Sequence, residues 1–288
     1  MDINNLQAFI EVAKQSSFSL AAAKLHLTKT AVSKRIATLE SSLSTKLFDR
    51  IGRQVVLTEA GHQLLPRAHK MLAEMDDIRR TLSNLSGEVS GVLSMGTSHH
   101  IGLRRLPPIL KQYATLYPNV SLDIRFLGSE LACAEVEKGN LELAIVTLPT
   151  QPSENLQFME LWDDPLQFVV SPNHPLAKLK QVNPEQLVSY PAVLTTEITY
   201  TREVLDEALK PLGLSVTTGL ATDYLETLMM MVDVGLGWGL LPETMLKDKK
   251  LKILSFPQLQ IRRRLGAVVH HSRTLSNAAR MMLDLCRE

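Results

Sequence analysis

Residues 17–36 read SFSLAAAKLHLTKTAVSKRI, two short helical patterns separated by a tight turn. Ser19 is suited to cap a helix over Leu20–Leu25, and Thr28 is suited to cap a longer helix that runs to about Leu43. The inward face of the longer helix is apolar at spacings of four and three, with Val32, Ile36, Leu39 and Leu43. The stretch therefore predicts a helix-turn-helix.

The opposite face of the longer helix carries short and basic side chains, namely Lys29, Thr30, Ser33, Lys34 and Ala37. The N-terminal residues of a recognition helix meet base edges in the major groove, while hydroxyl and basic groups hold phosphates. Residues 47–57 predict a hairpin, from which Arg50 and Arg53 could reach the flanking backbone as a wing. The alternative is an ordinary solvated helix face. The predicted DNA contacts are Ser19, Thr28, Lys29, Thr30, Ser33, Lys34, Arg35, Arg50 and Arg53.

The distribution of charge agrees with a nucleic-acid partner for the N-terminal part. Residues 1–60 hold eight lysines and arginines against five acidic residues, whereas residues 91–288 hold 19 against 21. A basic head on a near-neutral body predicts that only the head meets a polyanion. Ordinary scatter of charge is the alternative, because the excess is small.

A long heptad pattern follows, from Glu59 to about Ser86. Apolar residues alternate at spacings of four and three along it: Leu64, Ala68, Met71, Met75, Ile78, Leu82 and Leu85. Such a seam predicts a coiled coil with a second copy of the chain, and Thr58 is suited to cap the helix. Pro66 could kink it near its start. A long helix packed on its own domain is the alternative. Gly87 then marks a boundary.

From Val92 onward, short apolar strands alternate with helical patterns, which predicts mostly parallel sheets covered by helices. Ligands of such folds bind beyond the carboxyl ends of the strands, where helix N-termini favour anions. Polar residues at these ends predict a small carboxylate effector, with Trp238, Leu148 and Phe126 lining an apolar part of the cleft; an apolar or cationic effector, or plain helix caps, are the alternatives. The predicted effector contacts are Thr97, Ser98, His99, Gly128, Ser129, Thr147, Thr195, Thr196 and Trp238.

Several other functions are disfavoured by the sequence. The two cysteines, the N-terminus without a signal-peptide pattern and the lack of an apolar span favour a cytoplasmic protein. Adjacent histidine pairs point in divergent directions, so we expect no metal site, and we expect no cofactor. No nucleophile–base–orienter set is visible, which disfavours an enzyme. The basic run at residues 262–264 is interpreted as a solvated strand edge or a contact between lobes.

The helix-turn-helix stretch resembles the signature of the LysR-type transcriptional regulators of bacteria. The segments Leu47–Arg50 and Leu57–Gly61 continue it in register, and Asn173–Ala177 resembles the family's second half. Lys29, Thr30 and Ser44 depart from the family pattern. Lys29 is then a phosphate contact or a guanine reader rather than an adenine-reading amide. A solute-binding protein or an enzyme such as a prephenate-type dehydratase is the alternative that the C-terminal half alone would allow.

The resemblance implies a multidomain α+β chain: a winged helix-turn-helix over 1–58, a dimerisation linker helix over 59–87, and a two-lobed α/β effector domain of periplasmic-binding-protein type over 88–288. Lobe 1 would comprise about 88–161 and 267–288, and lobe 2 about 162–266, with chain crossings near Leu161–Asp163 and Arg264–Ala267. The implied partners are double-stranded DNA with an imperfect inverted repeat, a small-molecule effector, further copies in a homodimer or homotetramer, and RNA polymerase if the protein is an activator.

Overall fold

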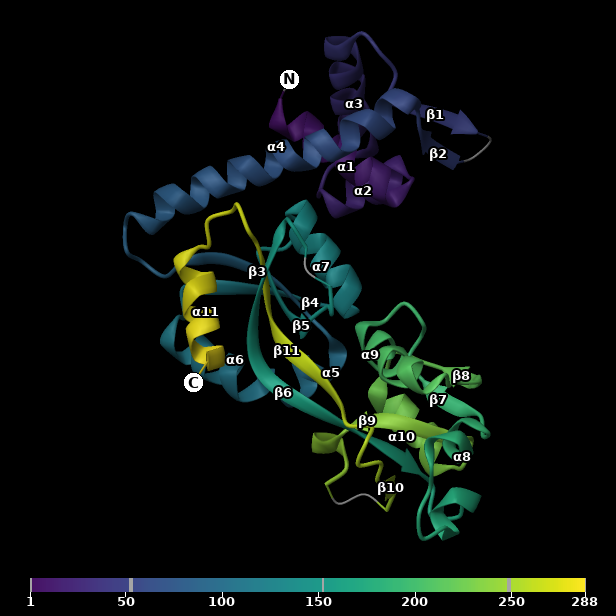
Figure 1. Ribbon diagram of the computed structural model, residues 1–288. Coiled ribbons are helices and arrows are strands. Elements are labelled where there is room, and N and C mark those ends of the chain that lie inside the picture. Colours follow the sequence, from purple (N-terminus) through teal and green to yellow (C-terminus); the bar gives the residue numbers. More distant parts are fainter. Residues whose placement is uncertain (1, 52–53, 152, 248–249, 288) are drawn as a thin grey trace. The chain divides into compact units, whose positions relative to one another are not determined.

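The computed structural model describes residues 2–51, 54–151, 153–247 and 250–287. It divides into two units, Met1–Ser86 and Gly87–Glu288, each with its own internal contacts (Figure 1). Arg53, one of the predicted DNA contacts, lies outside the described residues, and of Arg50 only the backbone is described.

The N-terminal unit is a helical bundle with a hairpin. Its elements are α1 (Ile3–Gln15), α2 (Phe18–Lys24), α3 (Lys29–Leu43), β1 (Phe48–Ile51), β2 (Gln54–Leu57) and α4 (Glu59–Asn84). Strands β1 and β2 pair in antiparallel fashion. The apolar faces of α1, α2 and α3 meet in one core, which contains Leu6, Phe9, Val12, Val32, Ile36 and Leu39. The helix-turn-helix prediction is therefore confirmed.

Two of the three predicted helix caps are present, and one prediction is wrong. The Oγ1 atom of Thr28 accepts a hydrogen bond from the Ala31 N–H at 3.1 Å, and Thr58 caps α4 in the same way. Helix α2, however, is capped by Ser17 rather than by Ser19. It begins at Phe18, whose ring packs against Phe48 with centroids 5.9 Å apart, so the apolar residue that was placed before the helix belongs to its first turn.

The C-terminal unit alternates strands with helices around one extended sheet. Its elements through β6 are β3 (Gly91–Thr97), α5 (His99–Arg104), α6 (Leu106–Leu116), β4 (Val120–Phe126), α7 (Ser129–Lys138), β5 (Leu143–Thr147) and β6 (Leu156–Val170). Those that follow are η1 (Pro175–Lys178), α8 (Pro184–Val188), β7 (Ala192–Leu194), α9 (Tyr200–Leu209), η2 (Lys210–Leu212), β8 (Thr218–Ala221), α10 (Leu225–Asp233), β9 (Trp238–Pro242), η3 (Glu243–Met245), β10 (Lys252–Leu254), β11 (Ile261–His270) and α11 (Asn277–Arg287).

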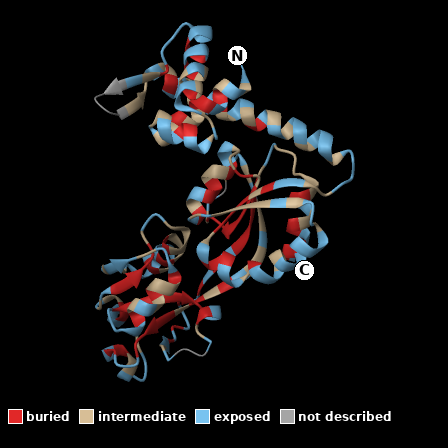
Figure 2. Ribbon diagram, turned by 180° about the vertical axis from the view of Figure 1, so that it is seen from behind, coloured by how far each residue is buried: buried red, intermediate tan, exposed pale blue. Residues whose placement is uncertain are grey.

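Two long antiparallel strands, β6 and β11, run from one lobe of this unit into the other (Figure 1). Lobe 1 is built around β3, β4 and β5, and lobe 2 around β7, β8 and β9. Each lobe has its own buried cores, with the inner faces of the strands covered by helices (Figure 2). At the crossing, Trp162 pairs with Leu265, and the register shifts between Leu265 and Gly266. A two-lobed α/β domain is thus observed.

The sheet is mixed, whereas mostly parallel pairing was predicted. Pairings among β3, β4 and β5 and among β7, β8 and β9 are parallel, but every described pairing of β6 and of β11 is antiparallel. The sequence pattern indicated only residues 168–170 of β6 and 266–270 of β11. The crossing segment of β6 carries Asp163, Asp164 and Pro165, residue types that are rare in strands, and that of β11 carries the basic run 262–264. No helix within the described ranges is long and apolar enough to cross a membrane.

Candidate functional site

The first candidate site is the exposed start of α3. Its inward residues Val32 and Ile36 are buried, while Lys29, Thr30 and Lys34 are exposed. Ser33 and Arg35 are half-buried on the flanks of this face, and Ser19 is exposed in the first turn of α2. Thr28 uses its hydroxyl oxygen as the cap of α3, which places the free backbone N–H groups of the first turn at the same end.

This face carries no carboxylate. The single acidic residue of α3, Glu40, is buried on the other side, where its carboxylate accepts hydrogen bonds from the Leu47 N–H at 2.9 Å and from Lys46 Nζ at 2.7 Å. Although burial opposes ionisation, these hydrogen bonds hold the pKa of Glu40 below its ordinary value. The cations at the start of α3 therefore face solvent without a neighbouring acid from their own helix.

The second candidate site is a pocket of about 250 Å³ between the lobes of the C-terminal unit. It lies at the carboxyl ends of β3, β5 and β7, next to the N-termini of α5, α7 and α9. Hydroxyl groups predominate among its polar walls: Ser98, Ser129, Thr147, Thr195, Thr199 and Thr201. The ionisable lining residues are His99, His100, Glu130, Asp223 and Arg263, and an apolar wall is formed by Phe126, Leu127, Tyr224 and Leu225.

Arg263 is the buried cation of this pocket, with 5% of its surface exposed. Its Nε donates to Asp164 Oδ2 at 2.6 Å, and its Nη1 donates to Thr201 Oγ1 at 3.0 Å. Its Nη2 has no hydrogen-bond partner among the described residues. Asp164 and Arg263 face each other in the register of β6 and β11, so the pair is set at the crossing between the lobes.

His100 lies beside this cation and is held neutral. It is 5% exposed, and neither ring nitrogen has a hydrogen-bond partner within the described part of the chain. Burial lowers its pKa to about 3, and the positive charges of Arg263, Arg104 and Arg105 act in the same direction. Arg263 and His100, which both line the pocket, thus hold a guanidinium nitrogen and an imidazole without partners among the described residues, and such buried polar groups occur at functional sites.

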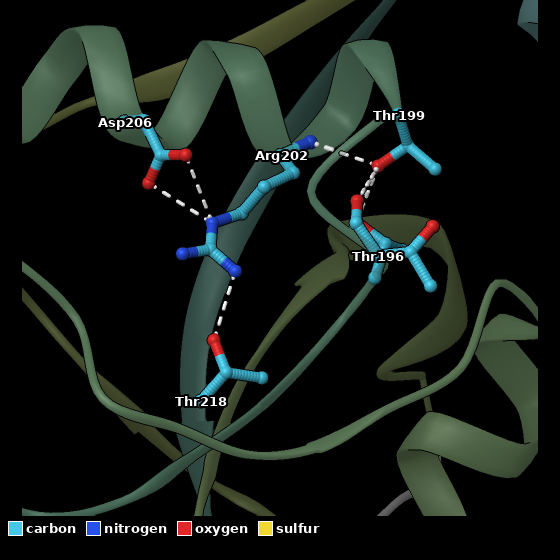
Figure 3. A network of polar contacts seen from close by, with 6 residues as sticks. Thr196, Thr199, Arg202, Asp206 and Thr218 are labelled. Carbon is cyan, nitrogen blue, oxygen red and sulfur yellow. Dashed lines mark hydrogen bonds and ion pairs between the residues drawn. The ribbon is translucent and has the colours of Figure 1, made fainter.

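The wall from lobe 2 is organised by Thr199 (Figure 3). Its hydroxyl oxygen lies 2.8 Å from Thr195 Oγ1 and accepts from the Arg202 N–H at 3.2 Å, which makes it the N-cap of α9. Arg202 is buried and tied to Asp206 and to Thr218, so α9 is anchored against β8. Thr195 and Thr196 precede α9 in a loop, and the helix itself begins at Tyr200.

The structure places the predicted effector contacts in two groups. Ser98, His99, Gly128, Ser129, Thr147 and Thr195 line the pocket, and so does Phe126. Thr97, Thr196 and Trp238 do not. The Thr97 hydroxyl is buried and donates to the Ile145 carbonyl at 2.9 Å, and both the N–H and the hydroxyl of Thr196 donate to Asp223 Oδ1. Trp238 is fully buried in the lobe 2 core, where its Nε1 donates to the Tyr190 carbonyl at 3.0 Å. Leu148 is likewise a core residue.

Sequence reasoning missed the ionisable members of the pocket other than His99. Arg263 was interpreted as part of a solvated strand edge or a lobe contact. The structure excludes the solvated edge and buries Arg263 where the chain crosses between the lobes, beside the pocket. Its partner Asp164 is 99 residues away in the chain, and nothing local reveals that pairing. Glu130 and Asp223 look like ordinary helix-start acids in the sequence, because each precedes or opens a helix.

Contacts between the lobes close the pocket at its sides. Glu130 Oε1, from the first turn of α7, accepts from the Tyr200 N–H of α9 at 2.6 Å. The rings of His99 and Tyr224 meet edge to face with centroids 5.3 Å apart. Burial raises the pKa of Glu130, and the nearby charges of Asp223 and Glu203 add to the rise, while the Tyr200 N–H opposes it.

Comparisons with known proteins match both units of the chain. Residues 3–62 match the family model described as "Bacterial regulatory helix-turn-helix protein, lysR family", and residues 86–288 match the one described as "LysR substrate binding domain". A probable nitrogen assimilation transcriptional activator of Synechococcus elongatus is 30% identical, covering 100% of this chain and 95% of the relative. An uncharacterised HTH-type regulator of Azotobacter vinelandii is 61% identical over 108 residues, which are 38% of this chain and 75% of the relative.

Solved structures show the same fold over the whole chain. A full-length OxyR variant from Pseudomonas aeruginosa superposes with a TM-score of 0.74 at 22% identity, covering 100% of this chain and 95% of that one. Full-length CbnR in complex with its target DNA superposes with a TM-score of 0.66 at 16% identity, covering 100% and 99%. Since family models account for the helix-turn-helix and for the two-lobed domain, the chain belongs to the LysR family and is a DNA-binding transcriptional regulator with an effector-binding domain, not an enzyme.

Proposed function

We propose that this regulator reads DNA with the exposed start of α3 and is controlled by a small carboxylate bound in the pocket between its lobes. The observation that carries the effector assignment is Arg263, a buried guanidinium whose Nη2 has no partner within the described residues and which lines a pocket rich in hydroxyls, one of them its partner Thr201. A guanidinium edge with nearby hydroxyls is the donor set that suits a carboxylate.

The DNA contacts are proposed from exposure and charge. Lys29, Thr30, Ser33 and Lys34 lie on a face of α3 that has no acid of its own. None of the lysines and arginines on this face forms an ion pair with another described residue, so they are available to phosphates and base edges. Ser19 and Arg35 flank the face. From the sequence alone, Arg50 and Arg53 are proposed as contacts to the neighbouring backbone or minor groove.

A second copy of the chain is proposed along α4. Leu64 and Ala68, at the start of the heptad seam, pack into the core of the N-terminal unit. Farther along, Ile78 and Leu82 are 51% and 62% exposed, which is costly for a lone helix. Pairing of this part with its copy would set two α3 helices on an inverted repeat, and pairing of effector domains would extend the dimer to a tetramer. The regulator would act in the cytoplasm, with RNA polymerase as a partner if it activates.

The pocket is small, and this bounds the effector. A cavity of about 250 Å³ is below the range of roughly 300–1,000 Å³ that drug-sized ligands fill, so a metabolite of few heavy atoms fits best. The N-termini of α7 and α9 each favour negative charge, by about 0.3–1 kcal/mol in exposed settings. The hydroxyl of Ser98, at the start of α5, is not used as a side-chain cap and faces the pocket.

A bound effector can change the affinity for DNA only if it binds one arrangement of the lobes more tightly than the other. The lobes are joined by β6 and β11, and the pocket takes walls from both, so a bound ligand would favour the closed arrangement. A tenfold change in DNA affinity would require about 1.4 kcal/mol of difference in ligand affinity between the two arrangements.

Isothermal calorimetry of the full chain tests the effector assignment with a panel of small mono- and dicarboxylates and their amides. We expect at least one carboxylate to bind, its amide to bind at least tenfold more weakly, and Arg263→Gln to reduce carboxylate affinity at least tenfold. Arg262→Gln is the matched control, because Arg262 is exposed on the same strand and pairs with Asp163. If Arg263→Gln does not fold, Arg263→Lys keeps the charge without the guanidinium fork, and a loss of affinity is still expected. A carboxylate affinity that is unchanged in both Arg263 variants would refute the assignment.

A further inference from the structure

The charged residues around the pocket carry more negative than positive charge, which disfavours a ligand that is only an anion. Asp164 already neutralises Arg263 at 2.6 Å, and Glu130 and Asp223 bring two more carboxylates to the lining. Neither Glu130 nor Asp223 forms an ion pair with a lysine, arginine or histidine among the described residues. A ligand that carried only negative charge would enter a pocket with an excess of acid.

The opposite charges are separated by depth and by lobe. Arg263 and His100 are buried at 5% exposure, whereas Asp223 is exposed and Glu130 is half-buried. Glu130 belongs to α7 of lobe 1, and Asp223 directly precedes Tyr224, the N-cap of α10 in lobe 2. The neutralised Arg263–Asp164 pair and the neutral His100 are thus buried more deeply than the two carboxylates, of which each lobe contributes one.

The hydrogen bonds that Glu130 and Asp223 make within the protein do not explain why both residues are charged. Glu130 uses Oε1 for the Tyr200 N–H, and Asp223 uses Oδ1 for the N–H and hydroxyl of Thr196. The neutral amide oxygen of glutamine or asparagine can accept the same hydrogen bonds, so these contacts do not require a charge. The two carboxylates line one pocket and have no cationic partner among the described residues, which points to a positive group on the ligand.

We infer that the effector is a zwitterion, an amino acid or a similar amino-carboxylate, whose carboxylate lies against Arg263 and His100 and whose ammonium group lies between Glu130 and Asp223. The inference rests on the proposed function and refines it. Three N–H donors of an ammonium group would find acceptors on both lobes, so this group would hold the lobes together.

A metal ion is the other cation that paired carboxylates take. Within the described ranges, however, no group of three or more histidine, cysteine, aspartate or glutamate side chains is arranged to hold one. The rest of the lining is the apolar wall around Phe126, Leu225 and Tyr224, which suits an apolar side chain. The cavity volume of about 250 Å³ restricts that side chain to a modest size.

Calorimetry of the full chain with matched probes tests the inference. The probes are L-alanine, L-valine, L-leucine, L-methionine and L-phenylalanine, each beside the same molecule without its amino group and the same molecule without its carboxylate. We expect at least one amino acid to bind, its des-amino acid to bind at least tenfold more weakly, and its decarboxylated amine not to bind.

Variants separate the charge of the two acids from their backbone contacts. Glu130→Gln and Asp223→Asn keep an acceptor oxygen, so each should lower amino-acid affinity at least tenfold while leaving affinity for the des-amino acid unchanged or higher. If Glu130→Gln fails to fold, Asp223→Asn alone carries the test. Glu203→Gln on α9 is the control, since it removes a nearby acid that does not line the pocket.

The outcomes distinguish this inference from the proposed function. If carboxylates without an amino group bind as tightly as amino acids, and their binding still depends on Arg263, the inference of a zwitterionic effector is wrong and the proposed carboxylate site remains. If no probe that carries a carboxylate binds, or if binding ignores Arg263, both are wrong. Affinity for an amino acid that survives both Glu130→Gln and Asp223→Asn also overturns the inference.

Discussion

At the scale of single residues, the buried imidazole of His100 makes stability depend on pH. Its pKa in the folded chain is about 3, against an ordinary value of 6.5. The unfolded chain therefore binds more protons between these values, so the free energy of unfolding holds above pH 6.5 and decreases as the pH falls through this window.

Replacing His100 with glutamine should remove this dependence. Between pH 6.5 and pH 5, we expect the parent chain to lose about 1–2 kcal/mol more of its unfolding free energy than His100→Gln does. Urea unfolding followed by tryptophan fluorescence measures it, because both tryptophans, Trp162 and Trp238, lie in the C-terminal unit. Equal losses in the two proteins would show that His100 takes up no proton on unfolding.

A second residue-scale prediction concerns Lys34, which is exposed on the proposed DNA face. Because a lost base contact costs about 1–3 kcal/mol and a lost phosphate contact weakens all sequences alike, Lys34→Ala should reduce binding to the operator more than binding to random DNA. Fluorescence anisotropy with both DNAs measures the two affinities, and Lys14→Ala, an exposed lysine on α1, is the control. Equal reduction would make Lys34 a phosphate contact, and no reduction would remove it from the interface.

The residue scale also shows where sequence reasoning reached its limit. Hydroxyls at strand ends were predictable, because a strand followed by a helix places them at one edge of the sheet. Arg263 was not, because its burial depends on the register of two strands and on an aspartate far away in sequence. Trp238 was misplaced because an aromatic residue beside glycines looks the same in a core as in a cleft.

At the scale of elements, α4 serves two purposes along its length. Its first turns complete the core of the N-terminal unit through Leu64 and Ala68, while Ile78 and Leu82 stay largely exposed. The heptad pattern predicted the helix and its apolar stripe. It did not distinguish these two uses, because packing on a domain and packing on a second helix demand the same spacing.

We expect Ile78→Glu together with Leu82→Glu to dissociate the dimer, because two charges per chain would be buried in the paired seam. The control is Gln63→Glu with Ser83→Glu, which adds the same charge at exposed positions off the seam. Sedimentation velocity should show a halved mass for the first variant and the parent mass for the second. An unchanged mass for the seam variant would rule out pairing along this part of α4.

At the scale of the whole molecule, the order of helices and strands in the sequence predicted the types of domain correctly, but it did not predict how the strands pair in the sheet. The helix-turn-helix, the long helix and an α/β domain follow from periodicity alone. The mixed sheet does not, since β6 and β11 run antiparallel through both lobes, and where they cross β6 carries two aspartates and a proline and β11 carries three arginines. That crossing also brings Arg263 to the pocket with Asp164 beside it, so the missed strands and the missed arginine have one cause.

The central claim is that paired α3 helices read an inverted repeat, and hydroxyl-radical footprinting of the full chain on the DNA upstream of its own gene tests it most directly. The account predicts two protected patches on one face of the duplex, separated by about 34 Å or a whole number of such turns, and no discrete patches with Lys34→Ala at the same concentration. A single protected patch, or no protection by a folded chain, would contradict it.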